Sequence, residues 1–165
     1  MISMDTSTTK TGWAYFENSV YISSGVINLD TKESKKKYKN NTDLRIKDMC
    51  LNIFSLLNKY SPDIIVVEKL NVCRNMAVVR KLSKIIDIVY VYSILNNCTY
   101  YEIQPTQWRS KLGLQDGKKK REDFKQASIN YIKETYGIEV SDDEADSICA
   151  GLGYAEMFSS QQETN

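Results

Sequence analysis

The sequence predicts an α/β fold in which helices flank one mixed, five-stranded sheet. Three segments near the start alternate apolar and polar residues, and two later apolar runs, at residues 63–68 and 100–103, are separated by a stretch of helical period. Strands joined by short turns pair antiparallel, whereas strands joined through helices pair in parallel. The chain has 165 residues, 42% of them apolar and 26% charged, which is typical of one soluble globular domain.

The first three strands are expected at residues 2–5, 11–17 and 20–27, and the second and third of these segments are rich in aromatic and β-branched residues. The second and third form a hairpin that turns near Asn18-Ser19. Residues 63–68 (DIIVVE) form a continuous apolar run, which is typical of a strand buried on both faces of a sheet. A fifth strand follows at residues 100–103.

Helices are expected after these strands. Thr42 or Asp43 can cap a helix that runs to residue 60, where Pro62 ends it. Further helices are expected at residues 76–96, 118–136 and 142–158, and Pro105 precedes a short turn. Residues 32–39 are a basic surface stretch without periodicity. We expect a single domain over residues 1–158 and a polar, disordered tail over residues 159–165.

The net charge of +1 hides an asymmetry along the chain. Residues 1–133 contain all 22 Lys and Arg but 13 of the 21 Asp and Glu, which gives +9. Residues 134–165 contain the other 8 acidic residues and no basic residue, which gives −8. Because charge acts locally, a basic body can bind an anionic partner in spite of the near-neutral total.

Several classes of site and location are excluded or disfavoured by composition. The chain has no histidine, which excludes Ser-His-Asp catalysis and His-based zinc sites, so metal chemistry would rest on carboxylates and hard cations. The four cysteines form no CxxC pair, and we expect reduced, buried thiols. We see no signal peptide and no apolar run of the roughly 18 residues that span a bilayer, so a cytoplasmic protein is expected.

Two carboxylates end predicted strands. Asp5 ends the first strand and precedes a hydroxyl-rich segment that closes with Gly12; its alternative role is to form a turn. Glu68 ends the apolar run, where an ionised carboxylate is costly unless a cation or donor meets it. Ligands of open α/β sheets gather at the carboxyl ends of strands. A salt bridge of Glu68 to Lys69 or Lys81 is the alternative.

Asp143 and Asp146 lie three residues apart at the start of the last helix, and therefore on one face. Helix capping from Ser141 or Asp142 explains the acids of the first turn but explains Asp146 poorly. Asp146 precedes a stretch with Gly151 and Gly153, whose small size would let this helix approach a sheet closely. Together with Asp5 and Glu68, these residues could hold two divalent ions for phosphodiester hydrolysis.

Three segments resemble RuvC-type Holliday junction resolvases. They are Asp5 with its hydroxyl-rich turn ending in Thr11-Gly12, Val66-Val67-Glu68 after a buried strand, and Asp143-Glu144-Ala145-Asp146 near the C-terminus. The resemblance spans residues 1–158 and is greatest to stand-alone forms from phages of low-GC Gram-positive hosts, including lactococcal phages. It implies an RNase H-like fold, a homodimer, and Mg2+-dependent cleavage of four-way junctions that leaves 5′-phosphate and 3′-hydroxyl ends. It also implies that Asp5, Glu68, Asp143 and Asp146 are the catalytic metal ligands for two Mg2+, with Mn2+ able to substitute.

The resemblance extends to basic positions and also has departures. Arg74-Asn75 matches a basic-Asn pair after the family glutamate, and Arg109 falls near a family lysine that approaches the substrate. Lys118, Lys119 and Lys120 fall near a second such lysine. In place of the family's Pro-Gly and stacking aromatic, this chain has Thr6-Ser7 and Asn71.

Two basic clusters are candidate DNA contacts, although a charge run is often only a solvated face. The first contains Lys32, Lys35, Lys36, Lys37 and Lys39; the second contains Lys111, Lys118, Lys119, Lys120, Arg121 and Lys125. Tyr38 and Trp108 are the aromatic residues best placed to touch DNA, with core packing as the alternative for Trp108.

The helix at residues 76–96 has more apolar surface than one sheet face needs, which suggests a two-fold interface. Its candidate interface residues are Val78, Leu82, Ile85, Ile86 and Val89. A monomer in which this helix is fully buried is the alternative.

The sequence thus predicts a dimeric nuclease that cuts branched DNA, chiefly four-way junctions, with no membrane and no obligate protein partner. An RNA-directed nuclease of the same fold is one alternative, and a non-catalytic junction-binding protein is another. A sugar-kinase-like or actin-like ATP-binding protein is disfavoured, because that fold needs a second half and this chain has 165 residues and seven glycines.

Overall fold

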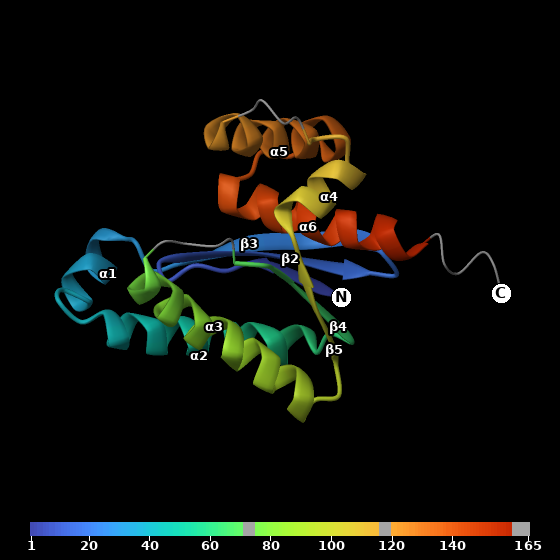
Figure 1. Ribbon diagram of the computed structural model, residues 1–165. Helices are drawn as coiled ribbons and strands as arrows, with labels where there is room; N and C mark the ends of the chain where they lie inside the picture. Colours follow the sequence, from blue (N-terminus) through green and yellow to red (C-terminus); the bar gives the residue numbers. More distant parts are fainter. Residues whose placement is uncertain (71–74, 116–119, 160–165) are drawn as a thin grey trace.

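The five strands form one sheet in the order β3-β2-β1-β4-β5 (Figure 1). The structure, a computed structural model, describes residues 1–70, 75–115 and 120–159. The strands are β1 (Ile2–Asp5), β2 (Lys10–Glu17), β3 (Val20–Asn28), β4 (Ile64–Glu68) and β5 (Thr99–Ile103). β1, β2 and β3 pair antiparallel, whereas β4 pairs in parallel with both β1 and β5. The predicted mixed sheet is therefore confirmed.

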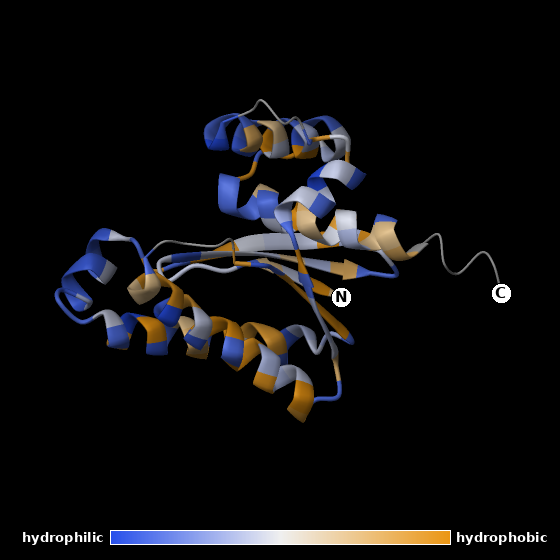
Figure 2. Cartoon of the chain, in the orientation of Figure 1, coloured by the Kyte–Doolittle hydropathy of each residue, from blue (hydrophilic) through white to orange (hydrophobic). Residues whose placement is uncertain are grey.

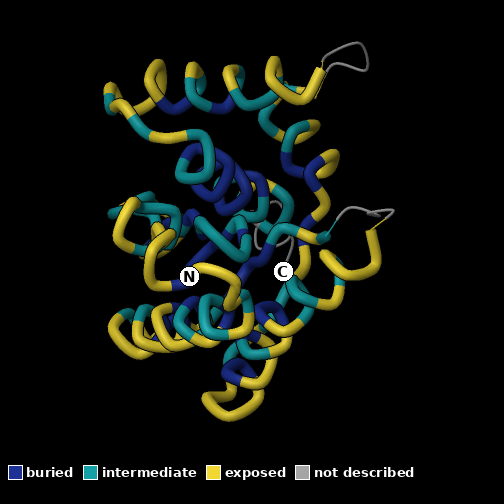
Figure 3. The backbone as a smooth tube through the Cα atoms, turned by 90° about the vertical axis from the view of Figure 1, so that its left-hand side faces the viewer, coloured by how far each residue is buried: buried dark blue, intermediate teal, exposed yellow. Residues whose placement is uncertain are grey.

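Helices cover both faces of this sheet. One face carries α2 (Thr42–Tyr60) and α3 (Met76–Leu95), and the other carries α4 (Pro105–Lys111), α5 (Arg121–Tyr136) and α6 (Asp142–Ser159), with α6 lying directly on the strands (Figure 1). Each face has its own core, and the core under α6 centres on Phe16, Val66 and Trp108. The first half of α6 is the most buried helical segment, while α5 is largely exposed on its outer side (Figure 3).

Glycines let α6 lie this close to the sheet, as the sequence predicts. A Cβ atom on Gly151 would come within 2.3 Å of the Phe16 ring, and one on Gly153 within 2.4 Å of the Trp108 Cβ. Ser3 of β1 donates a hydrogen bond of 2.6 Å to the Ser147 carbonyl of α6. Such contacts leave no room for a larger side chain, so the helix has one position on the strands.

Two short helices were not expected. Residues 32–39 contain α1 (Lys32–Lys37), because the Thr31 hydroxyl accepts a hydrogen bond from the Ser34 backbone and supplies an N-cap. Pro105 begins α4 rather than preceding a turn, since proline is suited to the first helical position. Asn41, rather than Thr42 or Asp43, caps α2. The predicted start of α5 at residue 118 lies outside the described residues. Of the tail predicted at residues 159–165, Ser159 is instead the last residue of α6, and the rest lies outside the described residues.

Surface character differs between helices (Figure 2). α1 is strongly hydrophilic, whereas α3 carries apolar side chains along its length, and several of them are exposed. Three of the predicted interface residues, Ile85, Ile86 and Val89, are buried in the core against α2 and the sheet. That part of the prediction is wrong, because these side chains have no surface left for a partner. Among the helices of the described residues, none has the length and apolar character that crossing a membrane requires.

Candidate active site

Asp5 and Glu68 lie side by side at the carboxyl ends of neighbouring parallel strands. The register pairs Met4 with Val67, so the next position on each strand is occupied by a carboxylate. Met4 and Val67 pack in the core under α2 and α3. Because side chains alternate along a strand, Asp5 and Glu68 point to the opposite face, towards α4 and α6. Topology alone thus brings together two residues that are far apart in sequence.

The start of α6 supplies the second pair of carboxylates. Asp142 forms an ion pair with Lys125, and Glu144 accepts a hydrogen bond of 2.6 Å from Ser24. Asp143 and Asp146 form no ion pair within the described residues, and Asp146 is only 6% exposed. The Ser141 hydroxyl accepts from the Glu144 backbone, so the capping prediction holds for Ser141 and does not account for Asp146.

Gly12 brings this helix end to Asp5. In the antiparallel ladder Gly12 is the partner of Asp5, and a Cβ atom on it would lie 1.9 Å from the Asp143 carbonyl oxygen. Backbone atoms cannot yield as a flexible side chain can, so only glycine fits between β2 and α6 here. The turn after Asp5 is held by Ser7 and Thr11, which leaves the Asp5 carboxylate without a turn-forming role.

The carboxylates share a common electrostatic environment. Burial raises the pKa of Asp5 well above its usual range, and the negative charges of Glu68, Asp146 and Asp143 raise it further. Burial, together with the charge of Asp146, raises the pKa of Glu68 to about 7. Burial likewise raises the pKa of Asp143 and of Asp146. Four acids at one location that resist ionisation together are typical of a functional site.

A divalent cation suits this group of acids. Asp146 has one buried carboxylate oxygen, Oδ1, without any hydrogen-bond donor, and such an oxygen is costly to bury. Hard oxygen donors of this kind are the preferred ligands of Mg2+ and Mn2+, whose charge would offset the mutual repulsion of the acids. Within the described residues, no three acidic or thiol side chains lie close enough to enclose an ion, so the four carboxylates would have to draw closer around a bound cation.

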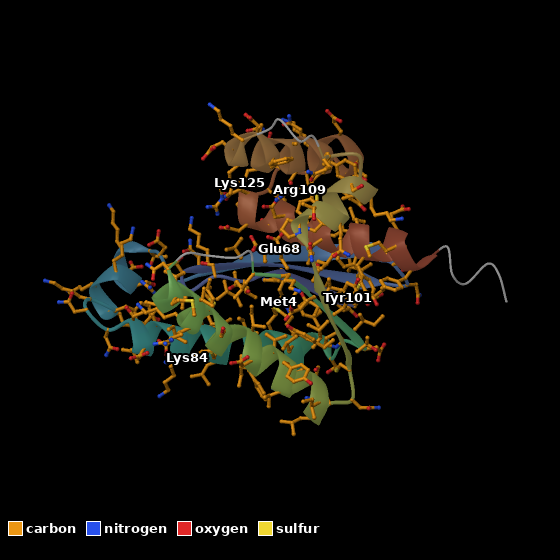
Figure 4. All side chains as sticks on the ribbon, in the orientation of Figure 1. Met4, Glu68, Lys84, Tyr101, Arg109 and Lys125 are labelled. Carbon is orange, nitrogen blue, oxygen red and sulfur yellow. The ribbon has the colours of Figure 1, made fainter. Side chains whose placement is uncertain are left out.

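Basic side chains surround the carboxylates and act against the effect of burial. Arg109 lowers the pKa of both Glu68 and Asp146. Arg121 lowers the pKa of Glu68 and Asp143. Lys125 lowers the pKa of Asp5 and Asp146. Figure 4 shows Glu68, Arg109 and Lys125 on the side of the sheet that faces α4 to α6, with Lys84 on the other side.

Lys10, at the start of β2, is a further basic neighbour of the site. Its charge lowers the pKa of Asp143, against the effect of burial. Sequence reasoning missed this residue, because its proximity to Asp143 depends on the pairing of β1 with β2 and on the packing of α6.

The other predicted DNA contacts have different surroundings. Lys35 and Lys37 of α1 are exposed but paired with Asp30 and Asp48, while Lys36 is exposed. Lys111 lies exposed in the last turn of α4, and Lys120 is exposed at the N-cap of α5. Arg74, Lys118 and Lys119 lie outside the described residues.

Three predicted contacts have structural roles. Asn75 caps α3, because its side-chain oxygen accepts from the backbone N–H groups of Ala77 and Val78. Trp108 is 0% exposed and Tyr38 is 7% exposed, so neither ring is available to stack on DNA. This corrects the prediction for both aromatic residues: Trp108 fills the core under α6, and Tyr38 donates to Asp48.

Comparison with known proteins identifies the fold. RuvC of Thermus thermophilus, solved in complex with a Holliday junction substrate, matches with a TM-score of 0.68 and 15% identity over 98% of this chain and 96% of that chain. The yeast mitochondrial Holliday junction resolvase Ydc2 matches with a TM-score of 0.62 and 16% identity over 99% and 80%. The chain has the fold of RuvC-type resolvases.

A viral protein shares the same fold. The Fowlpox virus resolvase, solved with Holliday junction DNA, matches with a TM-score of 0.60 and 19% identity over 95% of this chain and 97% of that chain. No protein-family model and no curated protein matches the sequence. The RNase H-like fold predicted from the three short segments is therefore confirmed by structure, although sequence comparison does not find it.

Proposed function

We propose that this protein is a divalent-metal-dependent endonuclease that resolves four-way DNA junctions. The observation that carries the proposal is the convergence of Asp5 and Glu68 from the sheet with Asp143 and Asp146 from α6. Support also comes from the fold, which is shared with solved structures of Holliday junction resolvases. The phage origin expected from the sequence, with a location in the bacterial cytoplasm, stays a prediction.

The four carboxylates would hold two Mg2+, and Mn2+ would substitute. Bound there, the two ions supply an activated water and stabilise the leaving oxygen of a phosphodiester, which yields 5′-phosphate and 3′-hydroxyl ends. The unpartnered Oδ1 of Asp146 is the oxygen of this group most in need of a cation. The raised pKa of Glu68, about 7, means that protons compete with the metal below neutral pH.

The basic side chains of the chain position the DNA. Arg109, Arg121 and Lys125 lie near enough to the carboxylates to change their pKa values, so they can hold the phosphate that is cut and balance its charge. α1 lies at the end of the sheet where β1 and β4 finish with Asp5 and Glu68 (Figure 1). Its lysines would contact a DNA phosphate farther along the strand from the one that is cut.

A homodimer fits a substrate with two-fold character that needs two cuts. The exposed large apolar side chains of α3 are Met76 and Val78 near its start and Tyr90, Val91, Ile94 and Leu95 near its end. These residues replace Ile85, Ile86 and Val89 as the proposed interface, and Leu82, which is half-buried, remains at its margin.

The test is to incubate the protein with a synthetic four-way junction, a linear duplex of the same sequence and an RNA–DNA hybrid, each with and without Mg2+. We expect paired, symmetric cuts in the junction only, and only with Mg2+. Mapping both cut strands gives the symmetry and the end chemistry. Faster cutting of the hybrid would assign the protein to the RNA-directed alternative, and junction binding without cutting would make it a binding protein.

A further inference from the structure

Trp108 connects the hydrophobic core to the carboxylate group. Its indole ring is 0% exposed, and its Nε1–H donates a hydrogen bond of 3.0 Å to Oε2 of Glu68, a residue 40 positions away in the chain. Buried indole N–H groups need an acceptor. Here the acceptor is not a backbone carbonyl but a side chain of the proposed active site.

The indole is held rigidly in this position. α4 begins with Pro105 and a reciprocal pair of hydrogen bonds between Gln104 and Gln107, which fixes the short helix. Gly153 of α6 lies so close that a Cβ atom on it would come within 2.4 Å of the Trp108 Cβ. Because the core on both sides is filled, the N–H cannot turn away from Glu68 without moving α4 or α6.

The face of the same ring holds a cation. The Arg109 guanidinium carbon lies 4.6 Å from the centre of the Trp108 ring and 4.8 Å from the centre of the Phe124 ring. A guanidinium close to two aromatic rings is held in place by cation–π attraction to both. Trp108 therefore contacts one acid and one base of the site at once.

We propose that Trp108 is a positioning residue that fixes Glu68 through its N–H and Arg109 through its ring, an inference that rests on the proposed nuclease function. The hydrogen bond commits one Glu68 oxygen to the indole, so that the other oxygen is the one that meets a divalent ion. A purely apolar side chain would fill the core equally well. The indole nitrogen adds a donor that holds the Glu68 carboxylate in one orientation, as donors behind metal ligands commonly do.

The test replaces only the N–H group of the Trp108 indole. Benzothienylalanine has the shape of tryptophan with sulfur in place of the N–H, and it can be incorporated in place of tryptophan during expression. The chain has two tryptophans, so a Trp13→Phe background confines the replacement to position 108. Trp13 packs on the opposite face of the sheet, next to Tyr60. The Trp13→Phe protein with ordinary tryptophan is the matched control.

The main readout is the binding of Mn2+ alone, measured from the electron paramagnetic resonance signal of the unbound ion. We expect the analogue to bind Mn2+ about 10- to 100-fold more weakly than the control, with an unchanged circular dichroism spectrum. Single-turnover cleavage of a junction should slow by a similar factor, while junction affinity measured in EDTA stays the same. Trp108→Phe, which keeps an aromatic face for Arg109, should reproduce the metal defect.

Equal Mn2+ affinity of the folded analogue and its control would overturn the positioning role, even if the control cuts junctions normally. Failure of the proposed function would look different, and it would be seen before any analogue is made. In that case neither the unmodified protein nor the Trp13→Phe control would bind Mn2+ or cut a junction.

Discussion

Individual carboxylates make this protein sensitive to pH, and Glu68 is one of them. Its pKa rises from 4.5 to about 7 on folding, because burial and the charge of Asp146 disfavour the ionised form. A raised pKa means that the folded state binds the proton more tightly than the unfolded state does. The stability contributed by this group is therefore complete below pH 4.5 and is lost as the pH rises through 7.

We accordingly predict that the metal-free protein is less stable at pH 8 than at pH 5.5. Glu68→Gln should remove part of this difference and raise stability at pH 8 by on the order of 2 kcal/mol. Urea unfolding in EDTA at both pH values measures the effect. Asp5, Asp143 and Asp146 shift in the same direction, so some pH dependence should survive the substitution. A Glu68→Gln protein as unstable at pH 8 as the parent would contradict the assignment.

The sequence shows which carboxylates belong to the site more readily than it shows which other side chains contact them. Asp5, Glu68 and Asp146 stood out because a carboxylate beside apolar or small residues needs a reason to be there. The hydrogen bond from Trp108 to Glu68 could not be foreseen, because it depends on how α4 packs against α6. Lys10 was missed for the same reason: strand pairing, not sequence spacing, brings it to Asp143.

At the scale of elements, the contact between β2 and α6 determines whether the site forms. A Cβ atom on Gly12 would overlap the Asp143 carbonyl, so Gly12→Ala must push the start of α6 away from Asp5. We predict a loss of about 1–3 kcal/mol in stability and a loss of cleavage larger than stability alone explains. Thermal unfolding and junction cleavage below the melting temperature separate the two effects.

Gly113→Ala is the control for this change. Gly113 has a positive φ of 69°, and no heavy atom lies within 4 Å of the place that an added Cβ would take. Its substitution should therefore cost about 1 kcal/mol and leave cleavage intact. If the two variants lose cleavage equally, then close packing of α6 on β2 is not what assembles the site.

The basic helix α1 was the element least expected from sequence, because five lysines within eight residues show no helical period. Its N-cap at Thr31 and the anchoring of Tyr38 against Asp48 form it locally. We predict that Lys35→Gln with Lys36→Gln weakens junction binding and reduces the slope of log affinity against log salt by about 2. Binding titrations at several salt concentrations measure the slope.

Lys84→Gln is the matched control for α1, since Lys84 is an exposed, paired lysine on the side of the sheet away from Glu68. Its salt slope should equal that of the parent protein. An unchanged slope for the α1 double variant would show that these lysines form only a solvated face.

For the whole molecule, a mixed sheet of antiparallel and parallel strands flanked by helices was predictable, because short turns and helical crossovers leave few topologies. The apolar surface of α3 was also predictable, but not which side of the helix faces outward. Ile85, Ile86 and Val89 look like surplus apolar residues in the sequence, yet they complete the core under α2, while Ile94 and Leu95 are exposed.

The exposed end of α3 leads to a prediction about assembly. We expect the protein to sediment at micromolar concentration as a species of twice the 19.0 kDa chain mass. Ile94→Lys, which places a charge on that surface, should yield monomers with an unchanged circular dichroism spectrum, whereas Ile22→Lys on exposed β3 should leave the dimer intact. A parent protein that sediments only as the monomer would exclude the proposed dimer.

The molecule as a whole is proposed to cut branched DNA at a centre formed by the carboxylates of β1, β4 and α6. The most direct test is single-turnover cleavage of a four-way junction in Mg2+ by the parent protein, by Asp146→Asn and by Glu139→Gln, an exposed acid paired with Lys133. We predict that the parent and Glu139→Gln cut both strands, and that Asp146→Asn binds the junction normally but cuts at least about 100-fold more slowly. Cleavage by Asp146→Asn at the parent rate would contradict a carboxylate-built nuclease centre.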